Sequence, residues 1–332
     1  MIPESELEVA VPRRRSIAAR GWQLIKYVLA AGLLAYLALS VDWPKVWASA
    51  RAVSLPWLAI SLFYIPVGIW FIAVRYRCLI DKRVSLPAML RLVVFQAAIS
   101  TFLANVAGSL GYIGILAKVY RVPTALAVQS TIVARLAEML MAMVAAGVLA
   151  ALAWRELETL RPQMSLAIGF SLAVLIGATL AVIAARLIPD AWVRPVVDEG
   201  GAEPGFVRKL IGFVVRVVRL DARYLVLVVP PTLLYSLILQ IVIAVAMYCN
   251  AYAFHLDVSF VEAAFIGVVS SFIAGIPITV FGGLGVYEVS TVGLFVLFGV
   301  PADAATGMIL VVRTLFFIVM GIAFAVVRAP ER

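Results

Sequence analysis

The chain has 332 residues, of which 64% are hydrophobic and 14% are charged, and its formal net charge is +9. This composition excludes an ordinary soluble protein, because soluble domains carry about 25% charged residues. The basic residues are spread over several short segments with no recognisable nucleic-acid-binding module, so the positive charge does not indicate a nucleic-acid partner. We therefore predict an all-α integral membrane protein that crosses the bilayer several times.

Six apolar runs are long enough to cross a hydrocarbon core of about 30 Å. They cover residues 24–41, 56–74, 125–154, 165–187, 224–247 and 306–327. No small-residue cleavage site follows the first run, so we expect a retained span rather than a signal peptide. Residues 1–21 and 329–332 are predicted to be short tails, which leaves a single polytopic membrane domain at residues 22–328.

Two further apolar stretches, residues 89–118 and 262–299, are interrupted by polar residues, glycine or proline. The basic residues decide how these stretches are interpreted, because cytoplasmic loops carry an excess of Lys and Arg. If each stretch crossed the membrane once, the basic segment 186–223 would lie opposite the basic segment 75–91, which includes Arg75. If each stretch enters the membrane and returns on the same side, every basic cluster lies in the cytoplasm. We therefore predict about six transmembrane helices plus two re-entrant helical hairpins, with both termini in the cytoplasm.

An internal repeat is visible in the sequence. "RVPTALAVQSTIVAR" (121–135) and "GVPADAATGMILVVR" (299–313) share a Val-Pro pair, an alanine, a valine and a final arginine at one offset. A small-residue segment precedes each, "GSLG" at 108–111 and "GGLG" at 282–285, and we expect a turn at both. We predict an inverted repeat, with copies at about 56–154 and 224–327, because the first hairpin enters from the cytoplasm and the second from outside. Such repeats are typical of transporters with one central site.

The segment "PITVFGGLGVYEVS" (277–290) places helix breakers and a carboxylate in an apolar region. Non-helical backbone at membrane depth is tolerated where it is buried in protein or lines a water-filled cavity. We therefore predict that this break lines a cavity and that a helix begins at Val286. The alternative is close helix packing through small residues, which is common in membranes. The residues concerned are Pro277, Gly282, Gly283, Gly285 and Glu288.

Four ionisable residues lie well inside apolar segments: Arg135, Glu138, Glu288 and Arg313. A charge at the centre of a membrane helix costs at least about 2.5–3.5 kcal/mol, so each is a functional candidate. Arg135 and Glu138 are three residues apart on one helix and are able to pair, as are Glu288 and Arg313 across neighbouring elements. One interpretation is that these ion pairs only fix helix packing. The other is that the arginines flank a cleft and bind an anionic head group, with Asn105 and Gln129 adding hydrogen bonds.

These motifs resemble those of a known family. "PITVFGGLGVYE", followed by "LFGVPADAATGMILVVR", resembles the second-half signature of the lysylphosphatidylglycerol synthase transmembrane-region family, the flippase-like domain also found in the multiple peptide resistance factor. "NVAGSLG" and "ARLAEML" resemble its first-half pattern, although residues 104–111 lack the expected proline and Tyr112 stands where relatives often carry an acid. The resemblance covers about residues 20–327 and implies a lipid-flipping or lipid-handling membrane domain. The matched positions are Arg135, Glu138, Pro277, Gly282, Gly283, Gly285, Glu288 and Arg313.

A basic amphipathic segment at 205–223 is predicted to lie at the cytoplasmic interface. A basic stripe of this kind attracts anionic lipid, at about 1 kcal/mol per basic residue. Alternatively, the segment only fixes the orientation of the following span. Its basic residues are Arg208, Lys209, Arg216, Arg219 and Arg223.

Catalytic and metal signatures are scarce, since His255 is the only histidine and no P-loop is present. We therefore expect no enzyme activity, no cofactor and no metal. The predicted function is translocation or binding of an amphiphilic lipid, with a polar or anionic head group, in a bacterial-type cytoplasmic membrane. The alternative is a non-transporting accessory subunit of a separate lipid-modifying or glycosyl-transferring enzyme. In fused relatives an aminoacyl-transferase domain follows the membrane part, so we expect any lipid synthesis to need a separate partner.

Overall fold

The computed structural model describes residues 42–152, 227–275 and 284–327, together with the isolated positions 165, 169, 173 and 176. Every regular element in these ranges is a helix. Four helical segments are long and apolar enough to cross a membrane: Leu55–Leu79, Leu126–Leu152, Val229–Ala253 and Ala302–Val326. They correspond to four of the six predicted spans. The predicted spans at 24–41 and 165–187, both tails and the basic segment 205–223 lie outside the described residues, apart from those isolated positions.

Prolines mark the beginning of several helices. A proline occupies one of the first two helical positions of α2 (Trp43–Arg51), α3 (Leu55–Leu62), α5 (Leu86–Phe102) and α12 (Val229–Ala253). Proline suits these positions because its missing N–H would have no partner in the first turn, and its φ is already helical. The second predicted span is two helices, α3 and α4 (Tyr64–Leu79), which meet at Phe63.

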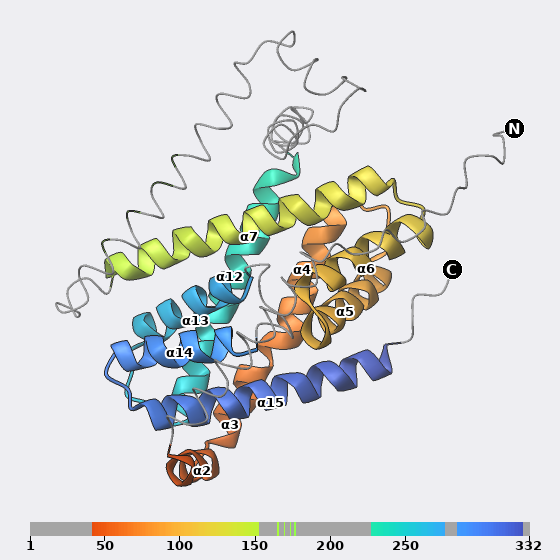
Figure 1. The fold of residues 1–332 in the computed structure, drawn as a ribbon. Coiled ribbons are helices and arrows are strands. Elements are labelled where there is room, and N and C mark those ends of the chain that lie inside the picture. Colours follow the sequence, from red (N-terminus) through yellow and green to blue (C-terminus); the bar gives the residue numbers. More distant parts are fainter. Residues whose placement is uncertain are drawn as a thin grey trace, which may run out of the picture.

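Each interrupted apolar stretch forms a pair of short helices. In the first, α5 is followed by α6 (Asn105–Lys118), and the two pack against each other. In the second, α13 (Phe260–Gly275) packs against α14 (Val286–Leu297), and residues 276–283 between them lie outside the described residues. Figure 1 shows the two pairs on opposite sides of the molecule. The predicted helical hairpins are therefore present as helix pairs.

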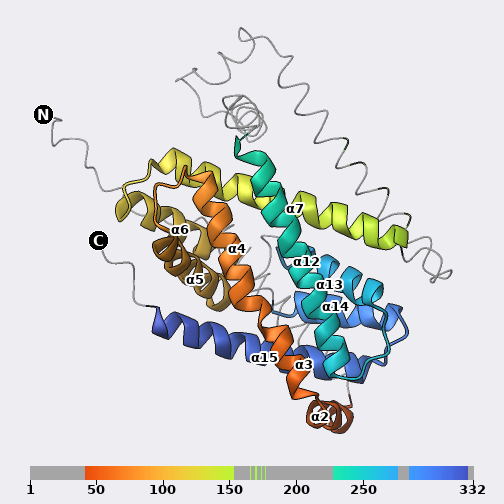
Figure 2. The ribbon, with the colours of Figure 1, turned by 180° about the vertical axis from the view of Figure 1, so that it is seen from behind.

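Two long helices border the remaining elements. α7 (Thr124–Leu152) follows the first pair, and α15 (Ala302–Val326) follows the second. In Figures 1 and 2 they run in opposite directions and cross α4 and α12 near opposite ends of those two helices, which pack against each other. A pair of short helices followed by a long helix therefore occurs twice, once in each half of the chain.

The turns that lead into α7 and α15 have a similar conformation. Arg121 and Gly299 both have positive φ, 52° and 82°. The next residues, Val122 and Val300, are buried, and each donates its amide to a carbonyl in the preceding short helix at 3.0 Å. The sequence match between 121–135 and 299–313 thus coincides with a shared local structure.

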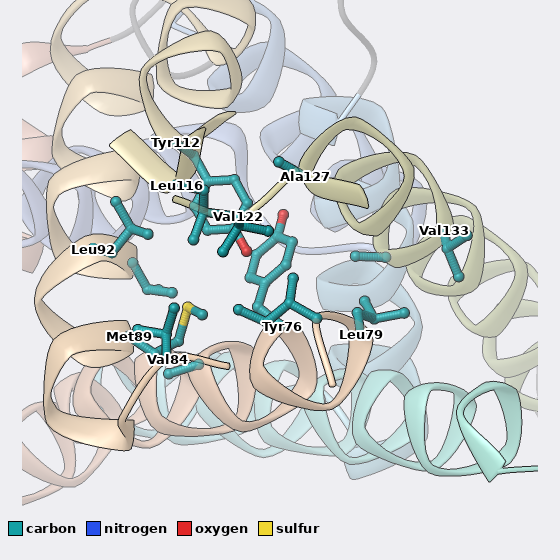
Figure 3. Packing of buried hydrophobic residues seen from close by; sticks show 14 residues of the cluster. Tyr76, Leu79, Val84, Met89, Leu92, Tyr112, Leu116, Val122, Ala127 and Val133 are labelled. Atoms are coloured by element: carbon teal, nitrogen blue, oxygen red, sulfur yellow. The ribbon is translucent and has the colours of Figure 1, made fainter. Parts of the chain in front are cut away.

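Each half has its own hydrophobic core. In the first half, α4, α5, α6 and α7 bury a cluster around Leu79, Leu92 and Leu116, shown in Figure 3. The rings of Tyr76 and Tyr112 lie 4.5 Å apart within it. In the second half, α12, α13, α14 and α15 bury a comparable cluster, joined by a residue of α3: Leu58, Met247, Ala251, Ala253, Phe254, Ala263, Ile266, Val292, Phe295, Val300, Ala305, Met308 and Ile309.

The turn predicted at 108–111 is wrong. These residues lie inside α6, and the chain breaks earlier, where α5 ends at Phe102 and Ala104 adopts an extended conformation (φ −165°, ψ 148°). At Gly108 a Cβ atom would meet the Ser100 hydroxyl and would lie 2.6 Å from the Gln96 carbonyl oxygen. Gly108 is therefore a site of close helix packing through a small residue.

Candidate functional site

The first group of charged side chains centres on Glu138 of α7. Arg135, one turn earlier on the same helix, places Nη1 3.8 Å from Glu138 Oε2. Arg75 of α4 places Nη2 3.1 Å from the same oxygen and donates a hydrogen bond to it. Its Nη1 also donates to the Ser236 hydroxyl of α12 at 2.9 Å. Two guanidinium groups therefore share one carboxylate, and Arg75 connects α4, α7 and α12.

The second group centres on Glu288, in the first turn of α14. Its Oε2 accepts a hydrogen bond from the Gly285 N–H at 2.6 Å, and Oε1 lies 3.1 Å from Nε of Arg313 on α15. Gly285 has φ 84°, a conformation that favours glycine, and α14 begins at Val286 as predicted. A carboxylate is favourable here because the first turn of a helix carries partial positive charge.

Aromatic rings surround the Arg313 guanidinium. Its Cζ lies 5.2, 5.5 and 5.0 Å from the ring centroids of Tyr287, Phe316 and Phe317. These distances are within the range of favourable cation–π contacts, which extends to about 6 Å. Together with Glu288, the rings allow a positive charge to be accommodated at membrane depth.

Both groups reach one cavity of about 280 Å³. Helices from both halves of the chain contribute to its wall. A second cavity of about 190 Å³ shares Ser100, Thr101, Arg135 and Glu138 with the first and extends toward Arg75. The polar lining residues of the larger cavity are Tyr64, Ser100, Thr101, Asn105, Arg135, Glu138, Asn250, Ser271, Tyr287 and Arg313.

Asn105 joins the two halves at this cavity. It is the first residue of α6, and its Nδ2 donates to the Ala274 carbonyl in the last turn of α13 at 3.3 Å. The last carbonyls of a helix have no partner within the helix, so a side-chain amide is a suitable donor. The two broken helices therefore meet through a polar contact beside the cavity.

The structure brings together most of the described residues that we predicted for the site. Arg135, Glu138, Asn105 and Arg313 line the cavity, whereas Glu288 is buried behind Arg313 and Gly285 is buried beside it. Pro277, Gly282 and Gly283 lie outside the described residues, as do the basic residues predicted for lipid-surface contact: Arg208, Lys209, Arg216, Arg219 and Arg223. Gln129, proposed as an additional hydrogen-bonding residue, does not line this cavity.

Arg75, which we grouped with the basic cluster at 75–91 and did not predict for the site, is a buried residue of the first charged group. The side chain is 2% exposed and lies in a candidate span, Leu55–Leu79. The apolar character of the span continues through Leu79 and Ile80, both fully buried, which indicates that Arg75 lies within the helix but not which way its side chain faces. The lining residues Ser100 and Asn250 were also missed, because single polar residues in apolar helices carry no distinctive spacing.

Metal ligands are not grouped in the described part of the chain. No set of three or more His, Cys, Asp or Glu side chains lies close enough there to hold an ion. The charged and polar side chains that line the cavity are suited to ionic and hydrogen-bonding contacts.

The family model described as Lysylphosphatidylglycerol synthase TM region matches residues 23–323. The chain belongs to this family. The matched range contains every residue that lines the cavity, so the site lies within the family's membrane region. The predicted family is confirmed, and with it the chain's nature as a multi-pass membrane protein. Searches of curated proteins and of solved structures returned no match.

Proposed function

We propose that this member of the lysylphosphatidylglycerol synthase TM region family binds the polar head group of an amphiphilic lipid in its cavity and moves it between leaflets. The proposal rests on a single observation. A polar cavity lies among apolar helices, and an arginine from each half of the chain is part of its wall. The head group on this proposal is anionic or zwitterionic, since the lining contains guanidinium groups.

The electrostatics support this proposal. A polar head group does not cross hydrocarbon readily, because its charges lose hydration. In the cavity, guanidinium, amide and hydroxyl groups are available to replace water around an anionic group. Glu138 and Glu288 neutralise part of the arginine charge when the cavity is empty, which reduces the cost of holding cations at membrane depth.

The order of the helices also supports transport. We propose that the two halves are inverted copies, because each contains a helix pair, a turn with positive φ and a long helix, and the two long helices run in opposite directions (Figure 1). In transporters, inverted repeats allow one central site to face either side of the membrane. The complete layout on this proposal is six spans plus two re-entrant hairpins, in a cytoplasmic-type membrane with both termini inside.

Lipid exchange in liposomes tests the proposed function. Purified protein is reconstituted with phosphatidylglycerol, phosphatidylethanolamine or phosphatidylcholine carrying a fluorophore on an acyl chain. The head group then stays intact, and lipid that reaches the outer leaflet is extracted by albumin. We expect exchange of at least one of these lipids and at least about tenfold slower exchange with Arg135→Gln, because the variant loses a charged contact to the head group.

Arg91→Gln is the matched control, since Arg91 is an exposed arginine of α5 that does not line the cavity. Its exchange rate should equal that of the wild type. If folded wild-type protein exchanges none of the three lipids, the transport proposal is contradicted, and the accessory-subunit alternative becomes the hypothesis to test. Equal exchange by wild type and Arg135→Gln would contradict the role of the cavity.

A further inference from the structure

The two charged groups at the cavity differ in their balance of charge. The first contains two guanidinium groups and one carboxylate, Arg75, Arg135 and Glu138. The second pairs one guanidinium with one carboxylate, Arg313 with Glu288. If each residue carries its ordinary charge, the excess positive charge among these described residues belongs to the first group.

Within the first group, Arg75 lies closer to the Glu138 carboxylate than Arg135 does. Its Nη2 is 3.1 Å from the carboxylate, against 3.8 Å for Arg135, and its Nη1 is bound to Ser236. The side chain of Arg75 is 2% exposed, whereas that of Arg135 is 37% exposed. A ligand in the cavity therefore reaches Arg135, while Arg75 stays engaged with protein groups.

The side chains of the second group are less exposed to the cavity and are engaged with protein groups. Arg313 is 14% exposed, contacts Glu288 and is surrounded by three aromatic rings. Glu288 is 1% exposed and also accepts the hydrogen bond that begins α14. Binding an anion at Arg313 would compete with contacts that hold α14 against α15.

We propose that Arg135 binds the anionic part of the head group, a singly charged phosphodiester, and that Arg75 is a positioning residue that makes this possible by neutralising Glu138. This inference rests on the proposed function and assigns its anion site to the first half of the chain. Arg313 serves to join α14 and α15. A phosphodiester carries one negative charge, which matches the single excess charge of the first group.

Two buried polar atoms beside this site also fit a ligand. The Ser100 hydroxyl and Asn250 Oδ1 have no hydrogen-bond partner among the described residues, and both residues line the cavity with Arg135. Buried polar groups normally have partners, so these are positions where a head group is able to supply one.

Binding of a short-chain phosphatidylglycerol tests the proposal. Dihexanoylphosphatidylglycerol is titrated into the purified protein in an uncharged detergent, and its Kd is measured by calorimetry. We expect about tenfold weaker binding with Arg135→Gln, because a charge-assisted contact is lost. The Arg313→Gln variant should bind within about threefold of wild type, and the exposed control Arg91→Gln should be unchanged.

A charge-balance rescue distinguishes positioning from a merely structural role for Arg75. The Arg75→Met variant leaves Glu138 to pair with Arg135, so binding should weaken about tenfold. Adding Glu138→Gln removes the competing carboxylate and should restore binding to within about threefold of wild type. Removing Glu138 would also relieve a purely structural defect, because it removes a partly buried carboxylate that has lost a partner. The free energy of unfolding is therefore measured for each variant: a positioning role changes Kd in variants of equal stability, whereas a structural role changes Kd only together with stability.

The proposal is overturned if Arg135→Gln and Arg313→Gln weaken binding equally, or if Glu138→Gln fails to rescue a folded Arg75→Met protein. If Arg313→Gln does not fold, the rescue experiment decides alone. Absence of binding to folded wild type would overturn the anion site, whereas the proposed lipid function is decided separately by the exchange of the three lipids in liposomes. Binding of the acyl-free head group, glycerophosphoglycerol, shows whether the site takes a lipid or a water-soluble phosphodiester. Binding of it as tight as the lipid's would contradict a lipid site while leaving the Arg135 assignment in place.

Discussion

Glu262 and Glu288 occupy the same local position in two helices with different surroundings. Each accepts a hydrogen bond from the backbone N–H three residues earlier, at 2.7 Å from Ser259 and 2.6 Å from Gly285. This is the carboxylate half of a capping arrangement at a helix N-terminus. Glu288 is also buried against Arg313, whereas Glu262 lies in the first turn of α13, where its capping hydrogen bond is exposed. The two residues therefore separate the effect of capping from that of the buried ion pair.

Glutamine at position 288 should destabilise the protein much more than glutamine at position 262. In either variant the amide oxygen still accepts the capping hydrogen bond, but Glu288→Gln leaves Arg313 without its carboxylate. Breaking a buried pair costs about 3–5 kcal/mol, whereas weakening an exposed cap costs about 1 kcal/mol or less. The free energies of unfolding in mixed micelles, obtained by denaturant titration, measure this difference. Equal losses would show that the Arg313 contact adds nothing to stability.

A charged site residue was predictable where it lies inside a long apolar run. It was not predictable where it lies beside other basic residues near the end of a span. Arg135, Glu138 and Arg313 stand alone in long apolar runs, so their cost at membrane depth identified them. Arg75 is two residues from Arg77, which donates to the Val84 carbonyl near the helix end. Residues two apart on an α-helix differ by about 200° in direction, so the two arginines face different surroundings. The rotation of α4 against α7 and α12 decides which one is buried, and no local pattern records it.

At the scale of elements, the helix pairs were predictable from the sequence, but the position of the first break was not. Interrupted apolar stretches correctly indicated short helices, but the first break was assigned to glycines that lie inside α6. The actual break uses Ala104, whose φ of −165° is open to any residue, so no glycine is needed there. Gly108 instead permits contact with Gln96 and Ser100 of α5. Composition therefore predicted the elements, while the position of the break depends on how α5 packs on α6.

Alanine at Gly108 should weaken the α5–α6 pair. The new Cβ atom would lie 2.6 Å from the Gln96 carbonyl oxygen, and backbone cannot move aside as a flexible side chain does. We expect a loss of about 1–3 kcal/mol, the usual effect of overpacking. Gly114→Ala on the same helix is the control, because no atom lies within 4 Å of a Cβ there. Alanine favours helix by about 1 kcal/mol over glycine, so this variant should be neutral or stabilising. Denaturant titration of both variants decides, and comparable losses would contradict close packing at Gly108.

At the scale of the whole molecule, helix lengths bear on the route of the chain through the membrane. α5 has 17 residues and α6 has 14, which correspond to about 25 and 21 Å. Each is shorter than a hydrocarbon core of about 30 Å, and the two helices pack against each other. The same holds for α13 and α14, with 16 and 12 residues, about 24 and 18 Å. On the proposed layout each pair is a re-entrant hairpin, so its two ends lie on the same side of the membrane.

Cysteine labelling from one side of the membrane tests this route. In a background of Cys78→Ser and Cys249→Ala, single cysteines are placed at exposed positions before and after each pair: Arg83 and Thr124, and Asp257 and Ala302. If each pair returns as proposed, a membrane-impermeant maleimide should reach Asp257→Cys and Ala302→Cys in intact cells. It should reach Arg83→Cys and Thr124→Cys only after permeabilisation, since the two pairs enter from opposite sides of an inverted repeat. If Arg83→Cys and Thr124→Cys react from opposite sides, α5 and α6 together cross the membrane, and both the re-entrant hairpin and the inverted repeat are excluded.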